Sequence, residues 1–202
     1  DLPTLYFIPE TDELEELLEE LERATFREEW LKRNVIEKLK SKFDLIIFDS
    51  SPTSGRLVSN AMVVSDLILS PLECSTNNFK NYARTRIKIT KKLQELGAQD
   101  ILIKHVPTKL RNTHISKEIF QEYQKIPACS THGIKTSELM ESSVYNGVSI
   151  IEYDPTSEPS TTMRDLVYEI FSEIDTHQSK QSTMAIKPIS SHQEEIRNPL
   201  MV

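Results

Sequence analysis

The chain has 202 residues, a formal net charge of −7 and 38% hydrophobic residues, which is ordinary for one globular domain. No apolar run approaches the roughly 20 residues that a membrane-spanning helix needs, so we expect a cytoplasmic protein with no membrane partner. Two cysteines, Cys74 and Cys129, lie far apart and outside any Cys-x-x-Cys pattern, and the five histidines do not cluster. These patterns argue against a zinc or iron–sulfur site.

The charge is unevenly distributed along the chain. Residues 1–44 hold 13 acidic and 7 basic side chains, whereas residues 76–125 hold 4 acidic and 11 basic ones. Such an asymmetry can mark a surface that faces an anion, and it can equally reflect two solvated helix faces of different composition.

The N-terminal part contains an expected strand and two expected helices. Residues 5–8 form a short apolar run that Pro9 ends, which predicts a buried strand. Leucines at helical spacing from Leu14 to Leu21 predict a helix, and a second helix is predicted over 27–41.

Residues 43–49 form an uninterrupted apolar run that ends in Asp49. A continuous run, in contrast to an alternating one, is typical of a strand buried on both faces of a parallel sheet. We therefore predict a strand over 43–49 and a loop over 50–55.

Strands and helices then alternate to the end of the periodic sequence. Helices are predicted over 57–64, 77–96, 116–125, 136–145 and 161–174, and strands over 67–69, 101–106 and 126–129. This alternation predicts an α/β fold with a doubly wound, mostly parallel sheet and helices on both faces. We expect one domain over 1–175 and a polar, disordered tail over 176–202.

Asp49 is the leading candidate for chemistry. A buried strand would deliver its carboxylate to the carboxyl end of the sheet, where ligand sites of α/β proteins lie. An acid at that position can hold Mg²⁺ through a water beside a bound triphosphate. It can also simply cap the following helix.

The stretch 43–72 resembles the Walker B and switch II region of ParA/Soj/MinD-like partition ATPases. That family has a hydrophobic run, then D-x-P-P-S-x-G, N-A-L and A-D-x-v-l-i-P-v, and the matching residues here are Asp49, Pro52, Gly55, Asn60, Ala61, Asp66 and Pro71. The family's first proline is replaced by Ser51. The resemblance implies that Asp49 organises Mg²⁺ through water and that Ser50, Ser51, Pro52 and Gly55 sense the γ-phosphate of ATP.

Further segments resemble the same family in the same order. Residues 5–9 are similar to its L-x-l-I-P strand, and residues 126–155 are similar to its closing segment. Residues 106–109 resemble the loop that lies over the nucleotide base, which implies that Pro107, Thr108 and Lys109 border the adenine, together with the loop after Pro127.

The family's phosphate-binding loop, K-G-G-x-G-K-[ST], is absent from these residues. None of the four glycines (Gly55, Gly97, Gly133 and Gly147) is followed by Lys-Ser or Lys-Thr. Phosphoryl transfer depends on positioning and charge stabilisation, so this chain alone is not expected to hydrolyse ATP efficiently. We expect the chain to be a fragment of a longer ATPase, with a truncated relative as the alternative.

Partition ATPases of this family bind DNA without sequence preference as ATP-bound dimers, through cations that neutralise phosphates. Candidates here are Lys80, Arg84, Arg86, Lys88, Lys91, Lys92, Lys109 and Arg111. Several of them recur about one turn apart on the predicted helix 77–96 and form a stripe. The alternative is a solvated helix face.

The resemblance implies a partition ATPase that binds MgATP, forms a homodimer, associates with nucleoid DNA and responds to a centromere-binding, ParB-like partner. Two other interpretations stay open. One is a catalytically silent interaction module, and the other is a positioning ATPase for another cargo.

Overall fold

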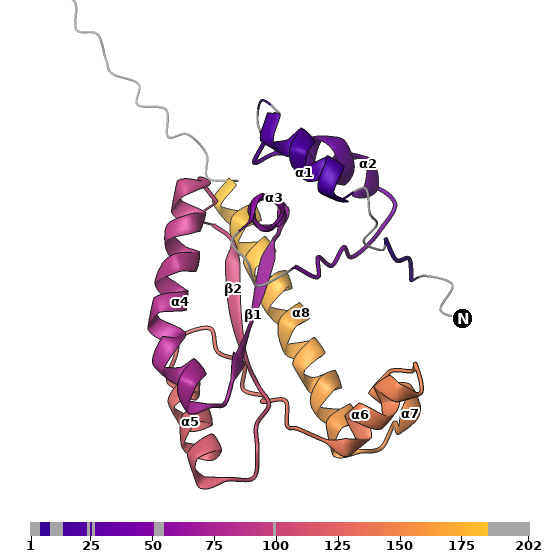
Figure 1. Cartoon of the computed structure of the whole chain (residues 1–202), viewed down its shortest axis with the longest axis vertical. Coiled ribbons are helices and arrows are strands. Elements are labelled where there is room, and N and C mark those ends of the chain that lie inside the picture. The colour runs from indigo at the N-terminus through magenta and orange to yellow at the C-terminus, as the bar shows by residue number, and fades with distance from the viewer. Residues whose placement is uncertain are drawn as a thin grey trace, which may run out of the picture.

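The computed structural model describes residues 5–8, 14–23, 25, 27–50, 55–98 and 100–185. Its centre is a parallel pair of strands, β1 (Leu67–Glu73) and β2 (Leu102–Thr108), in the register Leu67↔Leu102 to Glu73↔Thr108. The helix α4 (Thr76–Glu95) connects the two strands (Figure 1). The predicted parallel α/β architecture is thus confirmed for this part of the chain.

Helices cover both faces of the strand pair (Figure 1). On one face lie α4 and α5 (His114–Gln124), and on the other lies the long helix α8 (Glu158–Ala185). A small core joins β1, α4 and α5 around the fully buried Tyr123, with Leu72, Cys74 and Ile119 beside it and Tyr82 packed against it. The hydroxyl of Tyr123 donates to the carbonyl of Glu73 (3.3 Å) and so closes this core with a polar contact.

Two helices, α4 and α6 (Glu138–Tyr145), end where the sequence predicts. Gly97 follows α4 and Gly147 follows α6, and both glycines have φ of +67°. Only glycine adopts this left-handed conformation without steric cost, which explains its use as a helix terminator here. The sequence did not predict the single-turn helix α7 (Ile150–Tyr153), which a capping box between Ser149 and Glu152 begins.

The N-terminal helices lie near one end of the strands. They are α1 (Leu14–Arg23), the π-helix η1 (Lys32–Ile36), α2 (Glu37–Leu39) and α3 (Arg56–Val64). Both α1 and η1 contact α3, so α3 connects the N-terminal helices to the strand pair. The predicted helix 27–41 is confirmed over its central part.

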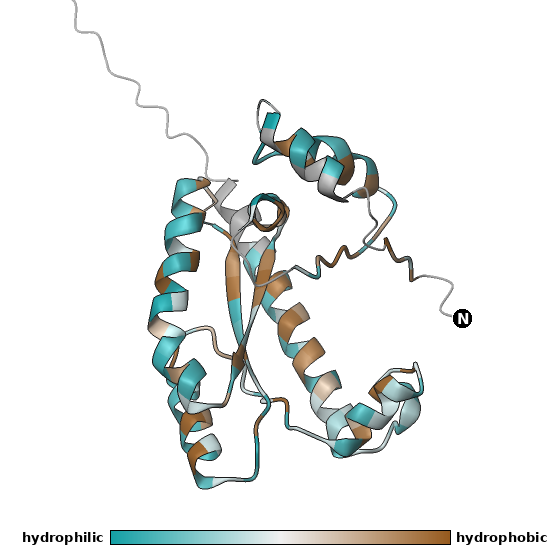
Figure 2. Cartoon of the chain, in the orientation of Figure 1, coloured by the Kyte–Doolittle hydropathy of each residue, from teal (hydrophilic) through white to brown (hydrophobic). Residues whose placement is uncertain are grey.

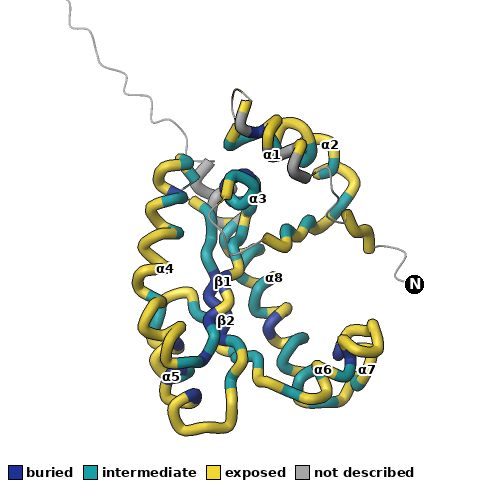
Figure 3. Tube along the Cα trace, viewed as in Figure 1, coloured by how far each residue is buried: buried dark blue, intermediate teal, exposed yellow. Residues whose placement is uncertain are grey.

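Two predicted strands are wrong among the described residues. Residues 5–8 and 43–49 form no strand, and Ile8 and Ile47 are each 79% exposed. The segment 43–50 crosses toward β1 from the side of α2 and is largely exposed (Figure 3). A strand forms only where a neighbour completes its hydrogen bonds, and β1 and β2 are the two paired strands in the described residues.

The C-terminal part also differs from the prediction. The predicted strand 126–129 is reduced to one parallel bridge between His105 and Cys129. The last helix, predicted to end at 174, continues to Ala185, so the tail predicted from 176 begins as helix. Residues 186–202 of that tail lie outside the described residues.

Candidate functional site

The candidate metal-organising residue, Asp49, lies in extended chain without strand pairing. Asp49 and Ser50 are both exposed, and the Asp49 carboxylate has no hydrogen bond or ion pair with the described residues. Ser51 and Pro52 lie outside them. Gly55 is the N-cap of α3 with extended geometry, φ −73° and ψ 174°. A free, exposed carboxylate fits water-mediated binding of Mg²⁺, but it supplies one ligand only.

Asn60, a residue of the resembling motif, has a clear structural role. It is 1% exposed, and its side-chain NH₂ donates to the carbonyls of Arg27 (2.7 Å) and Arg56 (3.1 Å). Its side-chain oxygen accepts from the amide of Leu31 at 2.9 Å. Asn60 therefore attaches the turn that precedes η1 to helix α3.

The residues expected at the base of a nucleotide lie at the carboxyl end of β2, and Pro107 and Thr108 belong to the strand itself. Pro107 is completely buried, Thr108 is half-buried and Lys109 is exposed, so only the last two can offer side chains to a ligand. Lys109 has a left-handed backbone, φ 51°, which is uncommon for a residue other than glycine and occurs often at ligand sites.

An ion pair joins the carboxyl ends of the two strands. The Lys109 ammonium lies 3.0 Å from Glu73 Oε2, and this hydrogen bond lowers the pKa of the Glu73 carboxyl below its ordinary value. The charge of Arg111 lowers it further, so Arg111, a DNA-binding candidate outside the α4 stripe, lies near this end of the sheet.

The candidate DNA-binding side chains on α4 are accessible. Lys80, Arg84, Arg86, Lys88 and Lys91 are exposed and Lys92 is half-buried. Figure 2 shows α4 as a mainly hydrophilic helix along one side of the molecule. In the described structure, the one ion pair of this stripe joins Lys91 to Glu95 at 3.8 Å. The stripe therefore presents accessible cationic side chains along α4.

A buried charge cluster lies between β2 and α8, and the sequence analysis, which placed Lys104 within the predicted strand 101–106, assigned no role to it. The side chain of Lys104 is 3% exposed and forms ion pairs with Glu169 (2.6 Å) and Glu173 of α8. Burial works to lower the pKa of Lys104, but these two carboxylates raise it overall. The ammonium stays charged and fastens α8 to the strand.

Glu169 is the centre of this cluster. Besides Lys104, it accepts hydrogen bonds from the Ser130 hydroxyl (2.9 Å), from the Thr131 amide and hydroxyl, and from His132 Nδ1 (2.9 Å). Burial alone would raise the pKa of the Glu169 carboxyl, yet these donors lower it to about 2. A period-based reading of the sequence cannot detect such contacts, which join residues 37 to 65 positions apart in the chain.

The other face of β2 carries the buried His105. Its Nε2 lies 3.4 Å from the Tyr82 hydroxyl of α4, and its Nδ1 has no hydrogen-bond partner in the described structure. Burial, with the nearby charge of Arg86, lowers the pKa of this imidazole. Burial also raises the pKa of both thiols, Cys74 and Cys129, to about 11, so neither is a reactive nucleophile.

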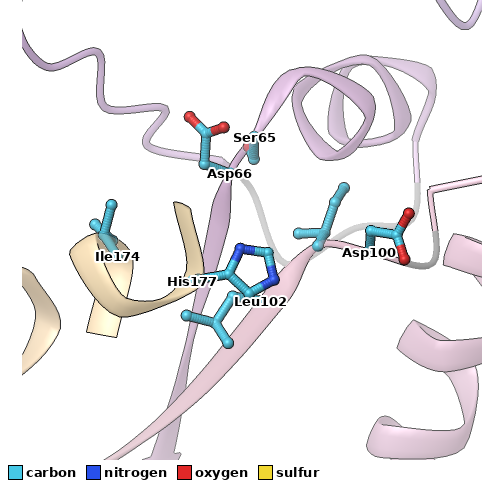
Figure 4. A pocket seen from close by; sticks show the side chains of 7 residues that line it. Ser65, Asp66, Asp100, Leu102, Ile174 and His177 are labelled. Carbon is cyan, nitrogen blue, oxygen red and sulfur yellow. The ribbon is translucent and has the colours of Figure 1, made fainter. Parts of the chain in front are cut away.

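One small cleft, of about 130 Å³, lies at the amino ends of β1 and β2. Figure 4 shows its lining side chains, with the carboxylates of Asp66 and Asp100 pointing to different sides and His177 apart from both. No group of three His, Cys, Asp or Glu side chains is placed to hold a metal within the described ranges. Since α/β ligand sites lie at the carboxyl ends of strands, this cleft is not the expected site. No described helix is long and apolar enough to cross a membrane.

Parallel strands joined by a helix, with helices on both faces, define an α/β protein. The chain matches the family model described as "AAA domain" over residues 1–122. It therefore belongs to that family, and it is a ParA/Soj-like member.

Curated relatives point to the same group. The sporulation initiation inhibitor protein Soj of Bacillus subtilis (strain 168) is 26% identical over 167 residues, which cover 81% of this chain and 65% of Soj. The plasmid partition protein A of Escherichia coli is 36% identical over 66 residues, which cover 33% of this chain and 16% of that protein. The chain thus spans less than two thirds of the length of either relative.

Solved structures agree on the fold. The structure of apo McdA from Cyanthece has a TM-score of 0.62 at 22% identity, and the match covers 79% of this chain and 67% of that one. A structure described as a partition protein has a TM-score of 0.57 at 16% identity, with 81% of this chain and 45% of that one covered. These likenesses confirm the P-loop-type α/β fold that the sequence predicted.

Proposed function

We propose that this chain is the Mg²⁺-organising and DNA-facing part of a ParA-like partition ATPase. The observation that carries the proposal is the cationic stripe on α4, which projects into solvent from a parallel sheet of the family's type. Exposed lysines and arginines in a row are the side chains that neutralise the phosphates of DNA without reading its sequence.

In this proposal Asp49 and the residues after it bind the Mg²⁺ and phosphates of ATP. Mg²⁺ would neutralise charge on the β- and γ-phosphates, and the exposed Asp49 carboxylate would hold a water of that ion. Ser50 to Gly55 would lie next to the γ-phosphate at the start of α3, and Thr108 and Lys109 would border the base. ATP-driven dimerisation and a ParB-like partner complete the proposed cycle.

The phosphate grip would come from residues other than these 202. An additional strand, carrying a glycine-rich loop at its end, would also give the apolar run 43–49 a neighbour in the sheet. Residues Leu45 (52% exposed) and Ile47 would then be buried. We therefore expect MgATP hydrolysis only when such a segment is present.

The DNA arm is tested by titrating labelled duplex DNA of random sequence with the MgATP-bound protein at several salt concentrations. Wild type is expected to bind with a steep salt dependence, and replacement of Lys80, Arg84 and Lys88 by glutamate is expected to abolish binding. A charge-matched control changes the exposed residues Lys38, Lys42 and Lys117. Absence of binding by wild type at low salt, or equal loss in both variants, would refute a DNA role for the stripe.

The ATPase arm is tested with Asp49→Asn in the protein that includes the phosphate-binding loop. Loss of the carboxylate is expected to reduce kcat at least about 100-fold, since preorganised charge stabilisation dominates phosphoryl transfer. Unchanged turnover would contradict the role of Asp49.

A silent interaction module is a second candidate function. The unpaired segment 43–50 and the absence of a glycine-rich loop favour it. A coding sequence whose native start lies at Asp1 would support this alternative, whereas an upstream K-G-G-x-G-K-[ST] motif would support the ATPase.

A further inference from the structure

A cleft of about 350 Å³ lies between the turn that precedes η1, the start of α3 and the C-terminal half of α4. The sequence analysis assigned Gly55 to the γ-phosphate sensor and Lys92 to the DNA-binding candidates, and it gave no site role to the other lining residues. Three of its lining residues are cationic and one is acidic. The lining residues are Arg27, Glu28, Gly55, Arg56, Ser59, Asn60 and Lys92.

The walls of this cleft are held together from inside. The buried Asn60 side chain bonds the carbonyls of Arg27 and Arg56, one from each side of the cleft. Asn60 therefore fixes the backbones of Arg27 and Arg56 relative to each other, whatever the side chains of the two arginines pair with. Such preorganisation lowers the entropic cost of binding a ligand between them.

An internal anion already lies between the two arginines. Glu28 Oε1 is 3.3 Å from Arg27 Nε and 3.6 Å from Arg56 Nη1. One carboxylate oxygen thus shows that the two guanidinium groups can converge on a single acceptor, as they would on a phosphate oxygen. The three side chains are 32% to 45% exposed, so this ion pairing contributes little to stability and is readily exchanged for another anion.

The cleft continues the cationic surface of α4. Lys92 lines it and lies one helical turn after Lys88 of the stripe. With Glu28 counted, the lining residues still carry an excess of two positive charges. A polyanion lying along the stripe would reach this cleft at the end of α4.

We propose that this cleft binds a phosphate group of the DNA backbone, and that the Glu28 carboxylate occupies its place when DNA is absent. The proposal extends the DNA-binding face that we propose above. Arg27 and Arg56 hold the phosphate from the two walls, Lys92 links it to the stripe, and Glu28 swings away into solvent.

The test compares two variants with matched controls in the salt-dependent DNA titration. Glu28→Gln removes the competing anion and is expected to tighten binding severalfold, whereas Glu16→Gln on the exposed face of α1 makes the same change in net charge. The triple change R27Q/R56Q/K92Q is expected to lower the slope of log Kobs against log salt by about 0.9 for each DNA phosphate that the protein no longer neutralises. The triple change K38Q/K42Q/K117Q is its control, and circular dichroism verifies that each variant folds.

The outcomes separate this inference from the proposed function. If the stripe variant fails to bind DNA but both cleft variants match their controls, the cleft inference is wrong and the DNA role stands. If wild type binds no DNA, pyrophosphate replaces it as the probe in a thermal-shift titration. If pyrophosphate stabilises wild type and R27Q/R56Q/K92Q abolishes this effect, the cleft is a site for free phosphate compounds and the DNA assignment is overturned. If pyrophosphate does not stabilise wild type, the site itself is overturned.

Discussion

The ion-pair cluster beneath α8 makes a sharp prediction for Glu169→Gln. This change keeps the shape of the side chain and removes the charge that Lys104, His132 and the 130–131 loop all contact. The Lys104 ammonium would then be buried against Glu173 alone, and α8 would lose its main polar attachment to β2.

The magnitude follows from the pKa of Glu169. Its native value is about 2, against an ordinary value of 4.5, and this difference corresponds to about 3 kcal/mol of stability at neutral pH. Breaking a buried ion pair by removing one partner generally costs about 3–5 kcal/mol, which agrees in order of magnitude.

The pH dependence gives the prediction its sign. Because folding lowers the pKa of this carboxyl, its contribution is fully present above pH 4.5 and is lost as the pH falls toward about 2. The difference between wild type and Glu169→Gln is therefore expected to shrink to about 2 kcal/mol at pH 3.5.

Urea denaturation followed by far-UV circular dichroism, at pH 7 and pH 3.5, measures both quantities. Glu122→Gln is the control, because Glu122 pairs with Lys125 at the surface, with 49% and 68% exposed side chains, and is expected to lose less than about 1 kcal/mol. A loss for Glu169→Gln no larger than that of the control, or one that does not shrink on acidification, would refute the reasoning.

Three further changes probe other parts of the fold. Asn60→Ala is expected to destabilise the protein by about 2–3 kcal/mol in urea denaturation, because it leaves the Leu31 amide and the Arg27 carbonyl without a partner; a loss below about 0.5 kcal/mol would contradict this attachment. Gly133→Ala would place a Cβ 2.6 Å from the Phe120 ring and should cost about 1–3 kcal/mol through overpacking, and an unchanged Tm would show that the ring moves freely. Burial lowers the pKa of His105, so its contribution to stability is present above pH 6.5 and declines below it; His105→Leu should make Tm less dependent on pH in that range, and an unaltered pH profile would count against it.

Local patterns predicted the helices and the parallel pair well. A long basic stretch indicated α4, glycines marked the ends of α4 and α6, and two apolar triplets located β1 and β2. In each case the signal lies within a few residues of the element that it describes, so no knowledge of distant partners is needed.

The polar interior could not be predicted in the same way. Lys104 and His105 are adjacent in sequence, yet they point to opposite faces of β2 and meet α8 and α4 respectively. Their partners, Glu169 and Tyr82, are distant in the chain. The predicted strand 101–106 includes both residues, but hydropathy gives no sign that their polar side chains are buried, because a buried charge is tolerated only where a distant partner pairs with it.

In the segment 43–49, hydropathy predicts a strand that the described residues do not form. The continuous apolar pattern of this segment requires cover on both faces and hydrogen-bonding strands on its edges, and the described residues supply neither, since Leu45 and Ile47 remain exposed. Apolar exposure of this kind is costly in water, at roughly 25 cal/mol for each Å² left uncovered. The sequence pattern therefore reports the environment that these residues need, and Asp49, at the end of the run, can be held firmly beside a metal–nucleotide only in a sheet that provides it.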